Sequence, residues 1–175
     1  MVALTADQAA FLLQLELPAQ KLEHPTTRRV IEAIPLDKGD YRPDPFSKSA
    51  LELAWHITAA EHRFLSGIAA GGFDFTPIHR PDNVKNSADI ANWFGQSFTA
   101  NFQKLTALST EAAAKILDFR GVLQLPAIAF SRFSLNHTIH HRGQLSAYIR
   151  AMGGKVPAIY GESYDSAEAK KTAQA

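Results

Sequence analysis

Four long stretches of the chain carry apolar residues at steps of three and four positions. They run from Thr5 to Ile34, from Ser49 to Ala70, from Asn86 to Leu105 and from Pro126 to Met152. This spacing places the apolar side chains on one face of a helix, and it is typical of helices that pack side by side. The pattern therefore predicts an all-α fold, most simply a four-helix bundle with long connecting loops.

Short polar motifs mark where these helices begin and end. The runs Thr5–Gln8 and Ser49–Glu52 have the form of a capping box, in which the first and fourth residues each bind a backbone N–H of the other. Asn86 is expected to cap the third helix, and Gly71 is expected to end the second. These motifs predict three helix starts and one helix end.

The first helical stretch contains two prolines, Pro18 and Pro25. Proline has no backbone N–H to donate, and its ring crowds the preceding turn. We therefore expect either a kinked helix or two separate pieces that end before Pro35.

Three connecting segments lack a helical period. Residues 35–48 and 71–85 are rich in proline, glycine and short polar residues, and residues 118–125 alternate loosely around Gly121. We expect residues 118–125 to be extended but find no convincing pair of strands. All three segments are long enough to cross between helices, so the apolar pattern leaves the topology open.

The chain has 175 residues, of which 46% are hydrophobic, which is ordinary for a globular protein with one core. We expect a single helical-bundle domain over residues 1–165 and a polar C-terminal tail over residues 166–175. The chain contains no cysteine, which excludes disulfides, thiolate metal ligands and a cysteine nucleophile. Any metal must therefore be held by nitrogen and oxygen atoms.

The charge distribution argues against nucleic acid as a partner. The chain has 18 basic and 17 acidic residues, and its only adjacent basic pairs are Arg28-Arg29 and Lys170-Lys171. The N-terminus lacks the charged start and apolar core of a signal peptide, and no apolar run approaches the ~20 residues of a membrane span. We expect a cytoplasmic protein that binds neither nucleic acid nor membrane.

Three of the seven histidines, His137, His140 and His141, fall within five residues. Residues four apart lie on the same face of a helix, so His137 and His141 project together. Two imidazoles buried without partners would be costly, which favours a shared metal ion. Spacing alone does not choose between the pairs 137/141 and 137/140, but the apolar stripe around them favours His141. That stripe consists of Phe130, Phe133, His137, His141, Leu145, Tyr148 and Met152.

A metal needs a third ligand, which we expect from a neighbouring helix. His56 is the best candidate because it lies on an apolar helical face, and helices packed ~8–10 Å apart leave room for two imidazoles and an ion. Three histidines would leave coordination positions for water or substrate. Candidates that fit less well are His24, His62, His79 and Glu52, the last as a carboxylate ligand or a base.

Two named metal motifs are absent from the chain. It contains neither His-Glu-x-x-His nor the Glu-x-x-His motif that di-iron bundles require. The run from His56 to Glu61-His62 is one residue too long for the inverted zincin motif, and the extra residue turns His62 off the shared face. Neither a zincin nor a di-iron site is expected.

The residues beside the histidine cluster also require an explanation. Glycine inside a helix costs about 1 kcal/mol relative to alanine, so we expect Gly143 to allow close approach of another helix. Arg142 and Gln144 are expected either to orient metal ligands or to form ordinary surface and interhelical hydrogen bonds.

The cluster belongs to the longer run His-Thr-Ile-His-His-Arg-Gly-Gln-Leu, from His137 to Leu145. It is preceded by Leu-Ala-Trp-His56 on an earlier helix and followed by Val-Pro-Ala-Ile-Tyr-Gly at residues 156–161. With these features the chain resembles the DinB/YfiT-like family of proposed metalloenzymes, over about residues 25–165.

The resemblance implies an up-down-down-up four-helix bundle that binds one divalent ion, commonly nickel or zinc, through three histidines. Carried over by position, these ligands are His56, His137 and His141. The same three residues follow from spacing and from the apolar faces on which they lie.

The resemblance also implies a divalent-metal-dependent enzyme that activates a low-molecular-weight thiol or water. The activated group would be transferred to a small electrophilic substrate or would hydrolyse it. Family members use bacillithiol, mycothiol or glutathione, and they often form homodimers. An alternative of another class is a non-catalytic dimeric metal-binding or stress-response protein, in which the histidines only tie helices together.

Overall fold

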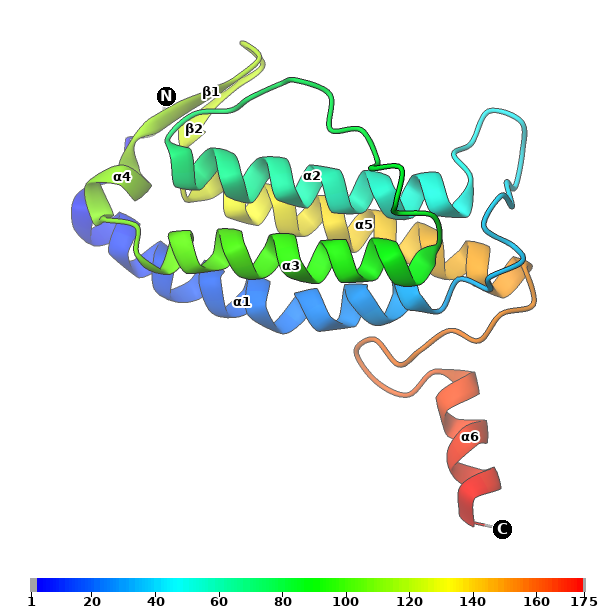
Figure 1. Cartoon of the computed structure of the whole chain (residues 1–175). Coiled ribbons are helices and arrows are strands. Elements are labelled where there is room, and N and C mark those ends of the chain that lie inside the picture. The colour runs from blue at the N-terminus through cyan, green and yellow to red at the C-terminus, as the bar shows by residue number, and fades with distance from the viewer. Residues whose placement is uncertain (1–2, 175) are drawn as a thin grey trace.

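The computed structural model describes residues 3–174 and is mainly helical (Figure 1). Its long helices are α1 (Ala6–Glu32), α2 (Ala50–Ala70), α3 (Ser87–Thr106) and α5 (Ala129–Ala151). The other elements are helix α4 (Thr110–Ala114), strands β1 (Ile116–Phe119) and β2 (Leu123–Pro126), and helix α6 (Tyr164–Gln174). The predicted four-helix bundle is confirmed.

Helices α1 and α5 run in one direction and helices α2 and α3 in the other, which is the up-down-down-up order (Figure 1). Helix α1 packs against α3 and α5, and α2 packs against the same two helices. Helices α1 and α2 are therefore diagonal in the bundle. Because α2 and α3 run parallel, the chain between them must return along the length of the bundle (Figure 1). No described helix is long and apolar enough to cross a bilayer.

The helix boundaries predicted from polar motifs are confirmed. Thr5, Ser49 and Asn86 each accept a hydrogen bond from the backbone N–H three residues later, and the side chain of that later residue binds back. Gly71 follows α2 with a left-handed φ of 71°, a conformation that glycine adopts without strain. Local sequence is therefore sufficient to place these ends.

Helix α1 runs unbroken through Pro18 and Pro25 (Figure 1), so the expectation of two separate pieces is wrong. Both prolines are exposed, and their rings do not disturb the core. Helix α1 packs against α3, α4 and α5. This packing offsets the backbone hydrogen bonds that the two prolines cannot donate.

Residues 116–126 form a β-hairpin, so the expectation that the chain has no strand pair is wrong. Strands β1 and β2 are antiparallel, with Phe119 opposite Leu123. The turn uses Arg120 and Gly121, whose φ angles are 58° and 70°. Gly121 could be recognised in the sequence as a turn residue. Arg120 could not, because arginine rarely adopts a positive φ. Pro126 closes β2 instead of opening the fourth helix, which begins at Ala129.

The segment predicted as a polar tail is helical, because α6 continues to Gln174 and projects away from the bundle (Figure 1). Ser163 caps its start by accepting a hydrogen bond from the backbone N–H of Ser166 at 3.1 Å. An ion pair between Arg150 Nη2 and Asp165 Oδ2 at 2.6 Å ties α6 to the end of α5. Residues 1–2 and 175, at the outer ends of the predicted domain and tail, lie outside the described residues.

A polar pair crosses the bundle interior between the diagonal helices α1 and α2. His24 Nδ1 lies 3.2 Å from Glu61 Oε1, and both side chains are buried. The His24 ring stacks between Phe94 and Phe98, with ring centroids 4.1 and 3.8 Å away. Burial raises the pKa of Glu61, while the hydrogen bond from His24 opposes that shift. No sequence pattern indicated this pair, because only packing brings the two residues together.

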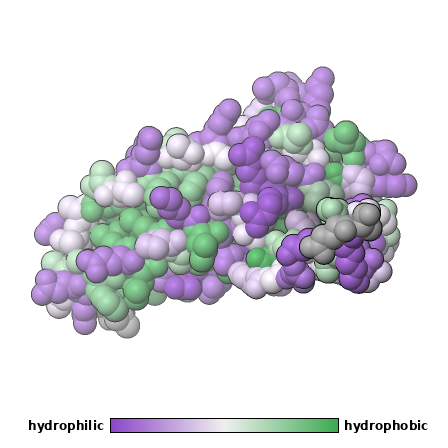
Figure 2. Space-filling model, turned by 90° about the horizontal axis from the view of Figure 1, so that it is seen from below, coloured by the Kyte–Doolittle hydropathy of each residue, from purple (hydrophilic) through white to green (hydrophobic). Residues whose placement is uncertain are grey.

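Helix α1 carries an exposed apolar stripe, the α1 stripe, which starts near its N-terminal end and is formed by Phe11, Leu15 and Leu22. These side chains are 60%, 49% and 75% exposed. Their spacing of four and seven residues places them on one helical face. Figure 2 shows apolar surface at this end of the molecule, in the left half of the view. Surfaces of this kind often mark contacts with another protein.

Candidate metal centre

Three imidazoles from two helices meet between α2 and α5. His56 Nε2 lies 3.1 Å from His137 Nε2 and 3.2 Å from His141 Nε2. One nitrogen from each ring lies within 4.8 Å of the others. His137 and His141 are one turn apart on α5, and His56 faces them from α2, which packs against α5. The structure therefore brings together the three histidines selected from the sequence.

The separations between these nitrogens suit a metal ion. An ion about 2.0–2.1 Å from each nitrogen, in tetrahedral geometry, would hold the nitrogens about 3.3 Å apart. The observed contacts of 3.1 and 3.2 Å are close to that value. Among the described residues, no further imidazole or carboxylate joins the group. An ion held by these three side chains alone would keep a coordination position for another molecule.

The protonation of the cluster also suits a metal. Burial, and after it the nearby charge of His141, lowers the pKa of His56 and of His137 to about 4. Both rings are therefore neutral at pH 7, as a metal ligand must be. Gln144 Oε1 lies 3.0 Å from His141 Nδ1 and accepts its hydrogen. That bond leaves the lone pair of His141 Nε2 directed at the cluster.

The other histidines lie outside the group. His140 is exposed, and its ring meets that of His141 edge-on with centroids 4.8 Å apart. The structure thus selects the pair 137/141 over the pair 137/140. His62 Nδ1 accepts a hydrogen bond from Ser97 Oγ at 2.7 Å, and His24 binds Glu61. His79 is exposed in the loop between α2 and α3.

Glu52 also lies outside the group, although it precedes His56 by one helical turn. Its Oε1 accepts a hydrogen bond from Arg42 at 2.8 Å, and its Oε2 accepts one from the backbone N–H of Ser49 at 2.9 Å. Both carboxylate oxygens are therefore engaged in the helix cap and an ion pair. The geometry therefore does not support the hypothesis that Glu52 is a metal ligand or a base.

The two residues that flank Gly143 have different roles. Arg142 is buried and donates to Glu23 Oε2 of α1 at 2.6 Å, so it links helices. Gln144 orients His141, as described above. The expectation for Gly143 is wrong, because a Cβ added there would meet no atom within 4 Å. No close helix approach requires this glycine, and nothing in the structure explains it.

A cavity of about 590 Å³ adjoins His56, between α2 and the loop that follows it. Its lining includes three basic side chains, Lys48, Arg63 and Arg80, and the indole of Trp55. Sequence reasoning missed this basic group because its members come from two loops and a helix. Each of them alone looks like an ordinary surface cation.

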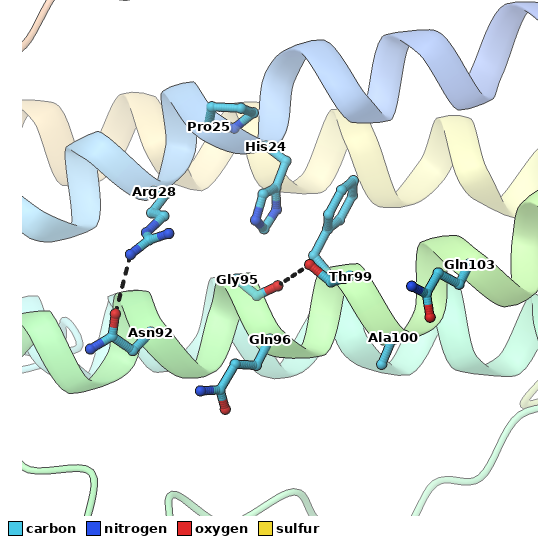
Figure 3. Close-up of a pocket in the computed structure, with 10 residues that line it drawn as sticks. His24, Pro25, Arg28, Asn92, Gly95, Gln96, Thr99, Ala100 and Gln103 are labelled. Carbon is cyan, nitrogen blue, oxygen red and sulfur yellow. Dashed lines mark hydrogen bonds between the residues drawn. The ribbon is translucent and has the colours of Figure 1, made fainter.

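A second hollow of about 590 Å³ lies between α1 and α3 (Figure 3). His24 points into it from α1, and Arg28 of α1 donates to Asn92 Oδ1 of α3 at 3.1 Å along its border. The α1/α3 edge of the bundle is opposite the α2/α5 edge that holds the three histidines. This hollow is therefore remote from the candidate metal centre.

The metal-free protein is expected to lose stability as the pH falls from 6.5 toward 4. When unfolded, His56 and His137 take up protons near pH 6.5, but when folded they do so only near pH 4. Above pH 6.5 both states are neutral and the two histidines contribute no pH dependence. Below it the unfolded chain binds more protons, which favours unfolding. Urea unfolding of chelator-treated protein, near neutrality and at about pH 5, measures the change.

The double variant His56→Gln/His137→Gln is the control for this prediction. It lacks both shifted groups, so its stability should fall less steeply over the same pH range. An equally steep fall in the variant would show that other groups cause the pH dependence.

Comparison with known proteins identifies a family of similar sequences. A model of the DinB family matches residues 19–173. The chain is 26% identical over 127 residues to the uncharacterized protein YjoA of Bacillus subtilis, covering 73% of this chain and 82% of YjoA. It is 31% identical over 113 residues to the uncharacterized protein YrdA of the same organism, covering 62% of this chain and 64% of YrdA.

Two crystal structures have a similar fold. The DinB-like protein YjoA of Bacillus subtilis superposes with a TM-score of 0.68 and 22% identity, over 85% of this chain and 99% of that one. A DinB-like protein of Bacillus cereus gives a TM-score of 0.70 and 24% identity, over 83% and 95% of the two chains. At these identities the likeness establishes the fold alone.

Proposed function

The chain belongs to the DinB family, and from that premise we propose that it is a metal-dependent enzyme whose ion is held by His56, His137 and His141. The proposed ion is nickel or zinc. The proposed reaction transfers a low-molecular-weight thiol to a small electrophile, or hydrolyses that electrophile with water. The observation that carries the proposal is the convergence of three Nε2 atoms with contacts of 3.1 and 3.2 Å.

A bound divalent ion would supply Lewis acidity, which lowers the pKa of a thiol or water that reaches it. The residues of the chain hold and orient that ion. Three imidazoles, at least two of them kept neutral by burial, would bind it, and Gln144 fixes the orientation of His141. The three rings are only half-buried, so a small molecule can approach them. Because the chain has no cysteine, a thiol nucleophile must arrive as a cosubstrate.

The homodimer expected from the sequence remains a proposal. The α1 stripe supports it, because its exposed apolar side chains provide a surface that a second copy of the chain would cover. This surface lies on α1, which is diagonal to α2 in the bundle. A dimer formed there would leave the cavity beside His56 open.

Removal and return of the metal tests the proposed function. We expect elemental analysis of the untreated protein to find about one equivalent of nickel or zinc per chain. After chelation, reloading with either ion should raise the rate of thiol conjugation or hydrolysis of small electrophiles by roughly 100-fold or more. Magnesium, which prefers oxygen ligands, should restore no activity and serves as the control.

Two results would contradict this proposal at different levels. A protein that binds one equivalent of metal but accelerates no reaction in a broad panel of electrophiles would be a metal-binding protein and not an enzyme. If the protein bound neither nickel nor zinc, the proposed metal site would be contradicted as well.

A further inference from the structure

The cavity beside His56 is lined by more cationic than anionic side chains. Lys48, Arg63 and Arg80 all line it, and none of them forms an ion pair within residues 3–174. Glu52, the one acidic residue in its described lining, is already paired with Arg42 at 2.8 Å. A negatively charged group placed in this cavity would therefore meet cations that have no salt-bridge partner.

One N–H group of Arg63 is bound to the backbone, and another has no hydrogen-bond partner among the described residues. Its Nη2 donates to the carbonyl oxygen of Thr76 at 2.7 Å, which fixes the guanidinium against the loop that follows α2. Its Nε is buried and has no hydrogen-bond partner among the described residues. A buried donor without an acceptor is unfavourable. An acceptor atom that reached this Nε would relieve that cost.

Half of the residues that line the cavity are apolar. Trp55, Pro77 and Ile78 line it, and Ala59 and Ala60 leave space beside them. Trp55 Nε1 donates to the carbonyl oxygen of Ile78 at 3.0 Å, so the indole is fixed to the loop. A cavity that combines apolar side chains with cations suits an organic anion better than an inorganic one.

The three cations come from separate parts of the wall. Lys48 precedes the cap of α2, Arg63 lies on α2 itself, and Arg80 lies on the loop that leads to α3. Positive charge spread in this way matches carboxylates at different positions on one molecule, whereas a phosphate concentrates its charge at one point. The planar guanidinium of arginine also matches the two oxygens of a carboxylate.

We propose that this cavity binds the substrate of the enzyme, and that this substrate is a small organic molecule with an apolar body and carboxylate groups. Because His56 also lines the cavity, a molecule held there lies beside one of the three imidazoles of the candidate metal centre. The description of this molecule as the substrate rests on the proposed metal-dependent function. The binding of a carboxylate to the cavity does not depend on the metal.

Isothermal titration of the full-length, metal-free protein with phthalate tests the proposal. Phthalate carries two carboxylates on a benzene ring, and phthalamide is its uncharged counterpart. We expect phthalate to bind at least roughly tenfold more tightly than phthalamide, because hydrogen bonds to charged groups are the stronger ones. We also expect its binding to weaken as salt is added. Equal binding of the two compounds, or tighter binding of phenyl phosphate than of phthalate, would overturn the carboxylate proposal.

Variants locate the binding site. Arg80→Met and Lys48→Met remove exposed cations that have no ion pair, and each should weaken phthalate binding by roughly tenfold. The control Lys21→Met removes an exposed cation from α1, the helix diagonal to α2, and should leave binding unchanged. Thermal unfolding should be the same in all three variants. If Arg80→Met and Lys48→Met both bind phthalate as tightly as the unaltered protein, the cavity is not the site.

A metal titration on the same variants separates this proposal from the proposed function. Arg80→Met should bind nickel and zinc as tightly as the unaltered protein, because Arg80 is not part of the histidine group. If the protein binds phthalate in this cavity but binds no metal, the proposed enzyme fails and the carboxylate site stands. If it binds metal but shows no preference for phthalate, the carboxylate site fails and the metal centre stands.

Discussion

Replacing His56 with alanine is expected to weaken the binding of nickel or zinc by at least about 100-fold. Loss of a group that only orients a ligand already costs about 10–100-fold in affinity, and His56 is proposed as a ligand itself. It is also central, because its Nε2 makes the 3.1 and 3.2 Å contacts to His137 and His141. Titration against a coloured chelator of known affinity measures the change.

His140→Ala is the matched control. His140 belongs to the same run on α5 and is adjacent to His141, but it is exposed and lies outside the group. Its removal should change metal affinity by no more than a few-fold. If His140→Ala weakened binding as much as His56→Ala, the ion would be held by a different set of histidines. If His56→Ala had no effect, the site between α2 and α5 would not be the metal site.

Replacing Arg142 with methionine is expected to lower the free energy of unfolding by about 3–5 kcal/mol. Arg142 is 1% exposed and is the largest fully buried side chain described in the protein. It donates to Glu23 Oε2 at 2.6 Å, to Thr27 Oγ1 at 3.2 Å and to the Tyr160 hydroxyl at 2.6 Å. Removing the cation leaves the largely buried Glu23 carboxylate without its partner. A buried charge without a partner is strongly unfavourable, so the folded state is destabilised. Urea unfolding measures the loss.

Arg150→Met is the control on the same helix. Arg150 pairs with Asp165 at 2.6 Å, but its side chain is 51% exposed. Exposed pairs typically contribute less than about 1 kcal/mol, because water screens and solvates both charges. The double variant Arg142→Met/Glu23→Met should recover part of the loss, since no buried charge then remains. Equal losses in Arg142→Met and Arg150→Met would show that burial does not set the strength of these ion pairs.

Much of the candidate metal centre could be predicted before the fold was known. His137 and His141 share a helical face because they are four residues apart, and that relation holds in any α-helix. His56 could be added because it is the remaining histidine that lies on an apolar helical face. The choice between His140 and His141 depended on the apolar stripe, and the exposure of His140 now agrees with it.

The basic cavity and the buried polar pair of His24 and Glu61 could not be predicted in the same way. Lys48, Arg63 and Arg80 have no shared period, and only the return of the loop between α2 and α3 brings them together. Glu61 and His24 face each other from diagonal helices, and no sequence spacing encodes that contact. These features depend on which helices become neighbours, and long loops leave that choice open.

The sequence alone determined the four helices, three of their N-terminal caps and the histidine pair on α5, because each depends on interactions between residues that are close along the chain. Tertiary packing decided the rest. It kept α1 continuous through Pro18 and Pro25, placed His56 against α5 and buried Arg142. Each of these outcomes depends on contacts between distant segments, which arise only once the apolar faces of the helices pack together.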